Sequence, residues 1–216
     1  MDRSVWLLPL IFVFIMWFVY WAEVFSGGDF GKYGILPRHL KGLRGILLSP
    51  FLHTNLKHLY NNTIPLIVLM MMLRYFYRNL STAVLMYGIP LTGFITWLIG
   101  RPSYHIGASG VIYLLVGFIF FSGVFRKYYR LVAMSLLVVF LYGGMIWYIF
   151  PVKSKISWEG HLAGFLTGLF LAVKYRYHPP YPETYHFERT EFDELFDEEG
   201  NFHLPDEENG DETNAL

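Results

Sequence analysis

Long apolar blocks separated by short polar stretches dominate the first 175 residues of this chain. A helix that crosses a lipid bilayer needs roughly 20 mostly apolar residues, and six blocks come close to that length. Because lipid offers the backbone no hydrogen-bond partner, each block is predicted to be a helix. The blocks run at about residues 6–22, 58–77, 83–99, 107–124, 131–150 and 158–173.

The segment between the first two blocks, residues 23–56, has a different pattern. It contains Gly-Gly-Asp, several basic residues and two short apolar stretches at 46–48 and 51–52. It is too interrupted to span a membrane and too apolar for a free linker, so it predicts an interfacial loop with short amphipathic pieces.

A signal peptide is the alternative for the first block. That block begins almost at the terminus and lacks a small-residue cleavage pattern, which favours an uncleaved helix.

Composition agrees with a membrane protein and adds an asymmetry of charge. Of 216 residues, 54% are hydrophobic and 19% aromatic, and the formal net charge is zero. Thirteen of the seventeen acidic residues nevertheless lie between positions 183 and 212. The chain is therefore predicted to divide into an apolar, basic domain at residues 1–175 and an acidic tail at residues 176–216. We expect this tail to be a disordered or weakly helical cytoplasmic extension.

The remaining composition excludes several classes of protein and predicts an orientation. Without cysteine, the chain has no disulfide, thiol nucleophile or cysteine-ligated metal. No nucleic-acid-binding module is visible, because the basic residues lie singly or in small groups between apolar blocks. Six helices would place both termini on one side of the membrane. The short loops on that side are basic, which predicts that it faces the cytoplasm, although the long first loop is also basic. These short loops carry Arg74, Arg78, Arg126, Lys127, Arg130, Lys174 and Arg176.

Polar side chains inside apolar blocks are costly, so they mark candidate functional positions. His58 and Asn62 lie four residues apart and share one helix face, although interhelical hydrogen bonding explains this pair more simply. Ser109 opens the fourth block after Gly107, which removes side-chain bulk where a substrate backbone would approach. The unpaired amides of a helix start would face a developing oxyanion there. A Gly-x-Ser-Gly motif alone is common, and it also suits a helix start that packs closely.

The sixth block carries a stripe of three residues, His161, Gly164 and Gly168, at positions i, i+3 and i+7. The glycines would let another helix approach, so a helix that bears Ser109 would meet a base. Tyr113 lies one turn beyond Ser109 and could stack on the imidazole. A serine–histidine pair without a carboxylate needs such an orienting group, although Tyr113 also suits an ordinary core position.

These residues fall into three motifs, each at the start of an apolar block. The motifs are His53-x4-His58-x3-Asn62, Gly107-Ala108-Ser109-Gly110-x2-Tyr113 and Gly160-His161-x2-Gly164-x3-Gly168. In this order and location they resemble the rhomboid family of intramembrane serine proteases, over about residues 1–175. The acidic tail lies outside the resemblance.

The resemblance implies an all-α membrane protein, with six transmembrane helices around a water-filled cavity that opens to the extracytoplasmic side. Ser109 would be the nucleophile and His161 the general base. The side chains of His58 and Asn62 would form the oxyanion hole together with the amide of Ser109. No metal or cofactor is implied.

The resemblance also assigns supporting roles and partners. His53 would support the first loop, Tyr113 would stack on the catalytic histidine, and Gly164 and Gly168 would pack the fourth helix against the sixth. The substrates would be single-spanning membrane proteins, cut in or near the membrane at small residues. The protein would reside with its lipid in the bacterial inner membrane, with both termini cytoplasmic.

One position departs from the family pattern, and two other functions remain open. Many members have Trp-Arg in the first loop, whereas this chain has Leu43-Arg44, with the spacing to His53 changed by about one residue. A metal-dependent membrane protein would use histidine ligands, although the His-Glu-x-x-His motif of zinc proteases is absent. The candidate ligands are His53, His58, His105 and His161. A rhomboid-like protein that binds transmembrane helices without cutting them would not need Ser109 or His161.

Overall fold

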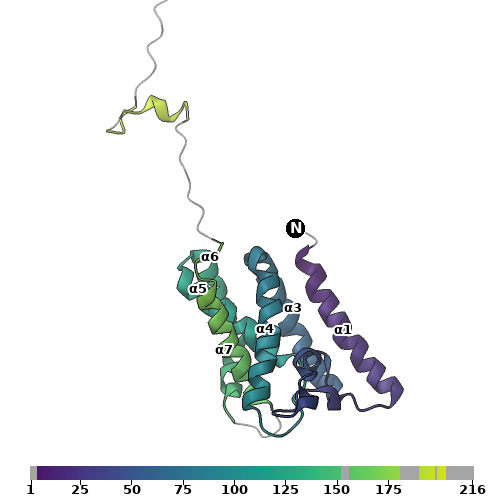
Figure 1. Ribbon diagram of the computed structural model, residues 1–216. Coiled ribbons are helices and arrows are strands. Elements are labelled where there is room, and N and C mark those ends of the chain that lie inside the picture. Colours follow the sequence, from purple (N-terminus) through teal and green to yellow (C-terminus); the bar gives the residue numbers. More distant parts are fainter. Residues whose placement is uncertain (1–3, 152–155, 181–189, 198, 203–216) are drawn as a thin grey trace, which may run out of the picture. The chain divides into compact units, whose positions relative to one another are not determined.

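A computed structural model describes residues 4–151, 156–180, 190–197 and 199–202 of the chain (Figure 1). The chain divides into two compact units, Met1–Tyr181 and Pro182–Leu216. The described part of the first unit is helical, as the apolar blocks predict. Its long helices are α1 (Ser4–Ser26), α3 (Leu56–Phe76), α4 (Arg78–Ile99), α5 (Ser109–Arg126), α6 (Tyr129–Tyr142) and α7 (Trp158–Lys174).

Two of these helices differ from the predicted blocks. The start of α4 is at Arg78 rather than near residue 83: within its first turn Ser81 is buried and accepts a 2.7 Å hydrogen bond from Arg74. The fifth block is not one α-helix. Since Gly143 and Gly144 favour helix weakly, α6 ends at Tyr142 and continues as a 3₁₀-helix, η4 (Gly143–Ile149).

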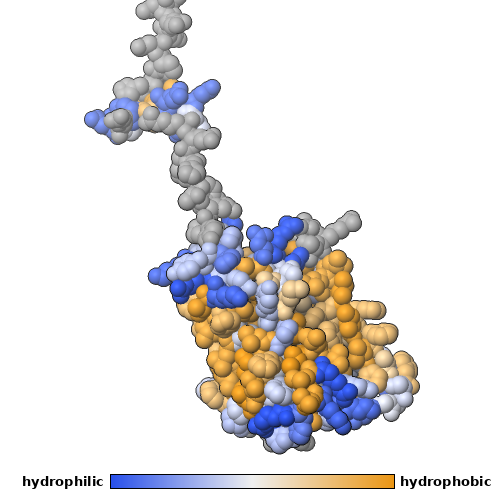
Figure 2. All heavy atoms as spheres, in the orientation of Figure 1, coloured by the Kyte–Doolittle hydropathy of each residue, from blue (hydrophilic) through white to orange (hydrophobic). Residues whose placement is uncertain are grey.

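Four helical segments of the described residues are long and apolar enough to cross a membrane: Val5–Ser26, Arg78–Ile99, Ser109–Arg126 and Tyr129–Ile149. The other two long helices, α3 and α7, are not in this set. The helix α7 has only 17 residues, and α3 begins with polar side chains. On the face seen in Figure 2, apolar residues cover the middle of the helical unit and hydrophilic residues gather at its two ends. This surface is that of a protein embedded in a bilayer.

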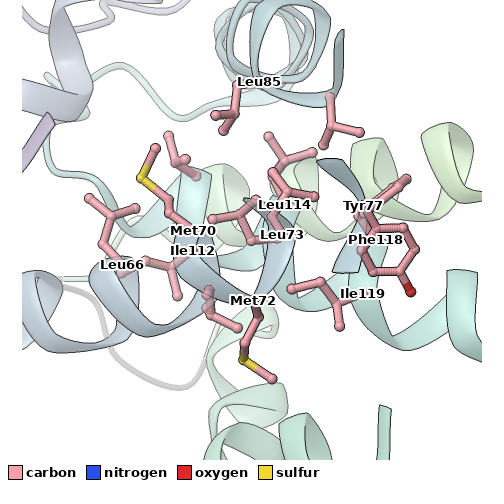
Figure 3. Close-up of a cluster of buried hydrophobic side chains, with 14 of the residues drawn as sticks. Leu66, Met70, Met72, Leu73, Tyr77, Leu85, Ile112, Leu114, Phe118 and Ile119 are labelled. Carbon is pink, nitrogen blue, oxygen red and sulfur yellow. The ribbon is translucent and has the colours of Figure 1, made fainter. Parts of the chain in front are cut away.

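The buried interior is centred on α5, which contacts α3, α4, α6 and α7. Figure 3 shows Leu66 and Leu73 of α3, Leu85 of α4, and Leu114 and Phe118 of α5 in one apolar cluster. Lipid is as apolar as these side chains, so close van der Waals packing, rather than escape from water, holds such a cluster together.

The helices α5 and α7 meet with their backbones in contact. A Cβ atom on Gly164 would collide with the carbonyl oxygen of Gly110, and one on Gly168 would collide with that of Leu114. A Cβ atom on Gly117, on the α5 side, would lie 2.7 Å from the carbonyl oxygen of Phe165. The structure thus places the predicted glycine stripe at the α5–α7 contact.

The segment between α1 and α3 consists of short helical pieces. They are η1 (Gly31–Tyr33), η2 (Leu40–Gly42), α2 (Gly45–Leu48) and η3 (Ser49–Phe51). At the position that departs from the family pattern, the Arg44 guanidinium lies 4.4 Å from the centre of the Tyr33 ring and donates to the Lys32 carbonyl at 2.9 Å. Arg44 is therefore held within the first loop itself.

The C-terminal end of α7 and the start of α1 lie at the same end of the first unit, shown at the top of Figure 1. In the described part of the second unit, a short 3₁₀-helix, η5 (Asp193–Leu195), precedes a bridge between Phe196 and Phe202. The expectation of a disordered acidic tail falls largely on residues 181–189 and 203–216, which lie outside the described residues.

Candidate active site

The first turns of α5 and α7 bring Ser109 and His161 together. Ser109 is the first residue of α5, and His161 lies one turn into α7. The Ser109 Oγ lies 2.9 Å from the His161 Nε2, across 52 residues of sequence. This is hydrogen-bonding distance, as general-base activation of a serine requires.

A backbone carbonyl of η4 fixes the orientation of the His161 ring. The His161 Nδ1 lies 2.9 Å from the carbonyl oxygen of Tyr148. A carbonyl only accepts hydrogen bonds, so Nδ1 carries the proton, and Nε2 presents a lone pair to the Ser109 hydroxyl. Sequence reasoning missed this partner, because every residue carries a carbonyl and only the course of η4 selects this one.

Tyr113 connects the same three elements. Its ring stacks on the His161 imidazole, with ring centres 4.3 Å apart and planes 12° apart. Its hydroxyl donates a 2.6 Å hydrogen bond to the Met145 carbonyl in η4. Tyr113 is therefore in place both to orient the imidazole and to hold the segment that carries the Tyr148 carbonyl.

His58 and Asn62 of α3 face the backbone just before Ser109. A Cβ atom on Gly107 would lie 2.7 Å from the His58 Nε2 and 3.9 Å from the Asn62 Nδ2. Gly107 also has a φ of +109°, a conformation that favours glycine. The Asn62 amide donates a 2.9 Å hydrogen bond to the His58 carbonyl, and an amide group has a second hydrogen for another acceptor.

A cavity of about 1260 Å³ joins these residues. Ser109, His161, His58, Asn62 and Tyr113 all line it. A volume of this size exceeds a typical small-molecule pocket of about 300–1,000 Å³, so the cavity has room for a stretch of extended peptide.

Comparison with known proteins identifies the family. A family model described as the rhomboid domain matches residues 41–178, which is more than half of the chain. The chain belongs to the rhomboid family. Rhomboids are intramembrane serine proteases, and a rhomboid with such apolar helices is an integral membrane protein.

Relatives of this chain occur in mycobacteria. A protein of Mycobacterium tuberculosis and one of Mycobacterium bovis are each 37% identical over 175 residues, which cover 76% of this chain and 72% of theirs. A protein of Mycobacterium leprae is 31% identical over 179 residues, covering 76% of this chain and 68% of its own. All three bear the name uncharacterized protein.

In this rhomboid, His53 lies behind His58 rather than in the cavity wall. Its side chain is buried, and its ring packs edge-on against His58 with centres 5.0 Å apart. Burial, together with the nearby His58 ring, lowers the pKa of His53 to about 4. His53 therefore stays neutral at physiological pH and packs against His58 in the first turn of α3.

The four histidines do not converge on a common point. Among the residues that the structure describes, no group of three or more histidine, aspartate and glutamate side chains is arranged to hold a metal ion. His161 bonds to Ser109, and His105 bonds to Ser157, so each faces a hydroxyl group.

Proposed function

We propose that this rhomboid is a serine endopeptidase that hydrolyses peptide bonds of membrane-protein substrates with Ser109 and His161. The observation that carries the proposal is the 2.9 Å separation of Ser109 Oγ and His161 Nε2 in the wall of a large cavity. The Tyr148 carbonyl favours the tautomer that accepts the serine proton, and the Tyr113 ring stacks on the imidazole. The carbonyl thus orients the base in the place of a third catalytic residue.

The reaction would proceed through an acyl-enzyme. Ser109 Oγ attacks the substrate carbonyl carbon while its proton moves to His161 Nε2, and the carbonyl oxygen becomes an oxyanion. Collapse of this intermediate breaks the C–N bond, and the proton on Nε2 passes to the leaving amine. Water then attacks the acyl-enzyme by the reverse sequence of proton transfers and frees the Ser109 hydroxyl.

The oxyanion would lie between α3 and the start of α5. The first amides of a helix have no partner within it, and the helix dipole favours negative charge there, so the Ser109 amide would donate. The His58 ring and the Asn62 amide approach Gly107 from the other side. Donors fixed before the reaction stabilise the transition state without reorganising, which makes this the largest expected electrostatic contribution.

In the proposed arrangement six helices cross the bilayer, with α3 and α7 spanning it beside the four more apolar helices. The ends of α3, α5 and α7 that carry Arg74, Arg126 and Lys174 would face the cytoplasm. The cavity lies at the other end and would open to the extracytoplasmic side of a bacterial plasma membrane. Single-spanning proteins would enter it from the lipid, because that is where their cleavable segments reside.

The direct test uses the purified full chain in liposomes with a single-spanning protein substrate. We expect cleavage by the wild type, none by Ser109→Ala, and no loss of activity with a metal chelator. A serine-reactive fluorophosphonate should label the wild type and not Ser109→Ala. Equal cleavage by both proteins would overturn the proposal, and a wild type that binds the substrate without cutting it would favour a non-proteolytic binder.

A further inference from the structure

A second serine–histidine hydrogen bond lies beside the proposed dyad, with the residue types exchanged. His105 precedes Ser109 by four residues, and Ser157 precedes His161 by four. The His105 Nδ1 lies 2.5 Å from the Ser157 Oγ, and both pairs span 52 residues of sequence. The connection that leads into α5 and the residue that precedes α7 are therefore joined by a hydrogen bond four residues before each member of the dyad.

The hydrogen-bond partners define the direction of this second bond. The His105 Nε2 lies 3.1 Å from the Arg101 carbonyl, so Nε2 carries the proton and Nδ1 accepts from the Ser157 hydroxyl. Burial lowers the pKa of His105, which favours the neutral ring. The Ser157 Oγ also accepts from the amide of Gly160 at 3.4 Å and so caps the start of α7.

An ion pair next to this bond ties the same two segments. The Glu159 side chain, only 2% exposed, accepts a 3.2 Å hydrogen bond from the Arg101 amide and lies 3.6 Å from the Arg101 Nε. Arg101 also donates to the carbonyl of Ile156, just before α7. A buried carboxylate is costly without its partner, so this pair resists separation of the two segments.

The connection before Ser109 is also fixed on its opposite side. His105 pairs with Ile35 of the first loop through two backbone hydrogen bonds of 2.8 and 3.0 Å, and the Gly107 amide donates to the Ser49 carbonyl at 2.8 Å. The start of α7 is held to this rigid connection by directional polar bonds. Farther along α7, the contact with α5 is made by glycine backbones, where van der Waals packing sets distance more firmly than axial position.

We propose that His105 and Ser157 are positioning residues, which set the register between the connection before Ser109 and the helix that carries His161. The inference rests on the proposed proteolytic function. The Ser157 hydroxyl donates to a histidine as the Ser109 hydroxyl does, but its oxygen also accepts from the Gly160 amide and caps α7, and we assign it this structural role. A shift of about 1 Å between reacting groups can cost on the order of 10²-fold in rate, so loss of register would act on turnover.

The test measures kcat and KM of the full chain in liposomes, and the rate at which a fluorophosphonate labels Ser109. His105→Phe removes the bond and leaves the Ser157 cap intact, whereas Ser157→Ala removes both. We expect each to lower kcat and the labelling rate by roughly 10- to 100-fold with little change in KM. Ser157→Thr keeps a capping hydroxyl and should restore most of kcat.

Ser135→Ala is the matched control. Ser135 is a buried serine of α6 whose hydroxyl donates to the Phe120 carbonyl of α5 at 2.9 Å, away from the cavity. It should lower the melting temperature without changing kcat. Wild-type kcat in His105→Phe, or an equal loss of kcat in Ser157→Thr and Ser157→Ala, would overturn the inference while proteolysis by Ser109 stands.

Labelling that persists in Ser109→Ala and disappears in Ser109→Ala/Ser157→Ala would identify Ser157 as a nucleophile. That result would overturn both the inference and the proposed function. A wild type that cleaves no substrate and takes no label would instead reject the proposed function itself.

Discussion

The two ends of the α5–α7 pair are joined by polar bonds of different kinds. At the cavity end, side chains bond to side chains: Ser109 to His161, and His105 to Ser157. At the opposite end the Arg126 side chain donates to backbone carbonyls just past α7, including that of Tyr175 at 2.6 Å and that of His178. Between the ends, glycine backbones make the contact.

This difference separates chemistry from anchorage. Carbonyls that follow a helix end have no intrahelical partner, so an arginine at that position satisfies them and offsets the negative end of the dipole. The same bond keeps the residues just past α7 within the first unit, whose boundary falls at Tyr181. Changes at the cavity end should therefore alter turnover, and changes at the Arg126 end should alter stability.

The largest expected effect is loss of the dyad. Ser109→Ala and His161→Ala should each lower kcat by on the order of 10⁴–10⁶-fold, and the double variant should be no worse than either, because the two residues act as a unit. Single-turnover cleavage in liposomes measures this. Circular dichroism should show unchanged helix content, and additive losses would contradict a shared role.

Removal of an oxyanion donor comes next. Asn62→Ala should lower kcat by about 10²–10³-fold with a smaller change in KM, because the donor acts on the charge of the transition state. His58→Ala should behave alike. If both variants lost only thermal stability at unchanged kcat, Asn62 and His58 would be interhelical packing groups and nothing more.

The glycine contact between the two ends should give an intermediate effect. Even Gly164→Ala places a Cβ atom against the Gly110 carbonyl. Because Gly164 lies one turn after His161, this part of α7 must move away from α5. A displacement of about 1 Å would lower kcat by on the order of 10²-fold. The same change at Gly168, farther from the dyad, should cost less activity for a similar loss of melting temperature. Full activity in both would show that α7 moves without moving His161.

Acid should destabilise the cavity end through His53. Its pKa in the folded chain, about 4, lies below the ordinary value of 6.5, so between these values the unfolded chain binds more protons. Stability should be unaffected above pH 6.5 and fall as the pH drops toward 4, by at most about 3 kcal/mol. Melting curves of wild type and His53→Phe in that window measure the contribution. Parallel pH profiles would assign the acid sensitivity to other groups.

The smallest effect on turnover is expected at the Arg126 end. Arg126→Ala should lower the free energy of unfolding by about 1–3 kcal/mol, because several hydrogen bonds from a charged donor are lost. Its kcat below the melting temperature should match the wild type. Arg126→Lys should recover only part of the stability, since an ammonium lacks the planar fork of donors with which a guanidinium reaches several carbonyls. A large fall in kcat would mean that the two ends are coupled.

Much of this protein could be predicted along the chain. The length of the apolar blocks gave the helices, because in lipid the backbone must bond within its own segment. The spacing of Gly164 and Gly168 predicted a close helix–helix contact, since helix periodicity places both on one face. Ser109, His161, His58 and Asn62 stood out as polar residues at the starts of apolar blocks, and their assignment to one site came from the resemblance of the three motifs.

The three-dimensional arrangement decided what no local pattern contains. The Tyr148 carbonyl that orients His161 has no signature in the sequence, because a backbone group is the same in every residue. The bond between His105 and Ser157 joins residues 52 positions apart, and a spacing of that length follows no helix period. The break after Tyr142, which forms η4 and brings the carbonyls of Met145 and Tyr148 to the site, depends on how α6 packs against its neighbours as well as on Gly143 and Gly144. Sequence thus determined which groups are present, and packing of the helices determined which of them meet.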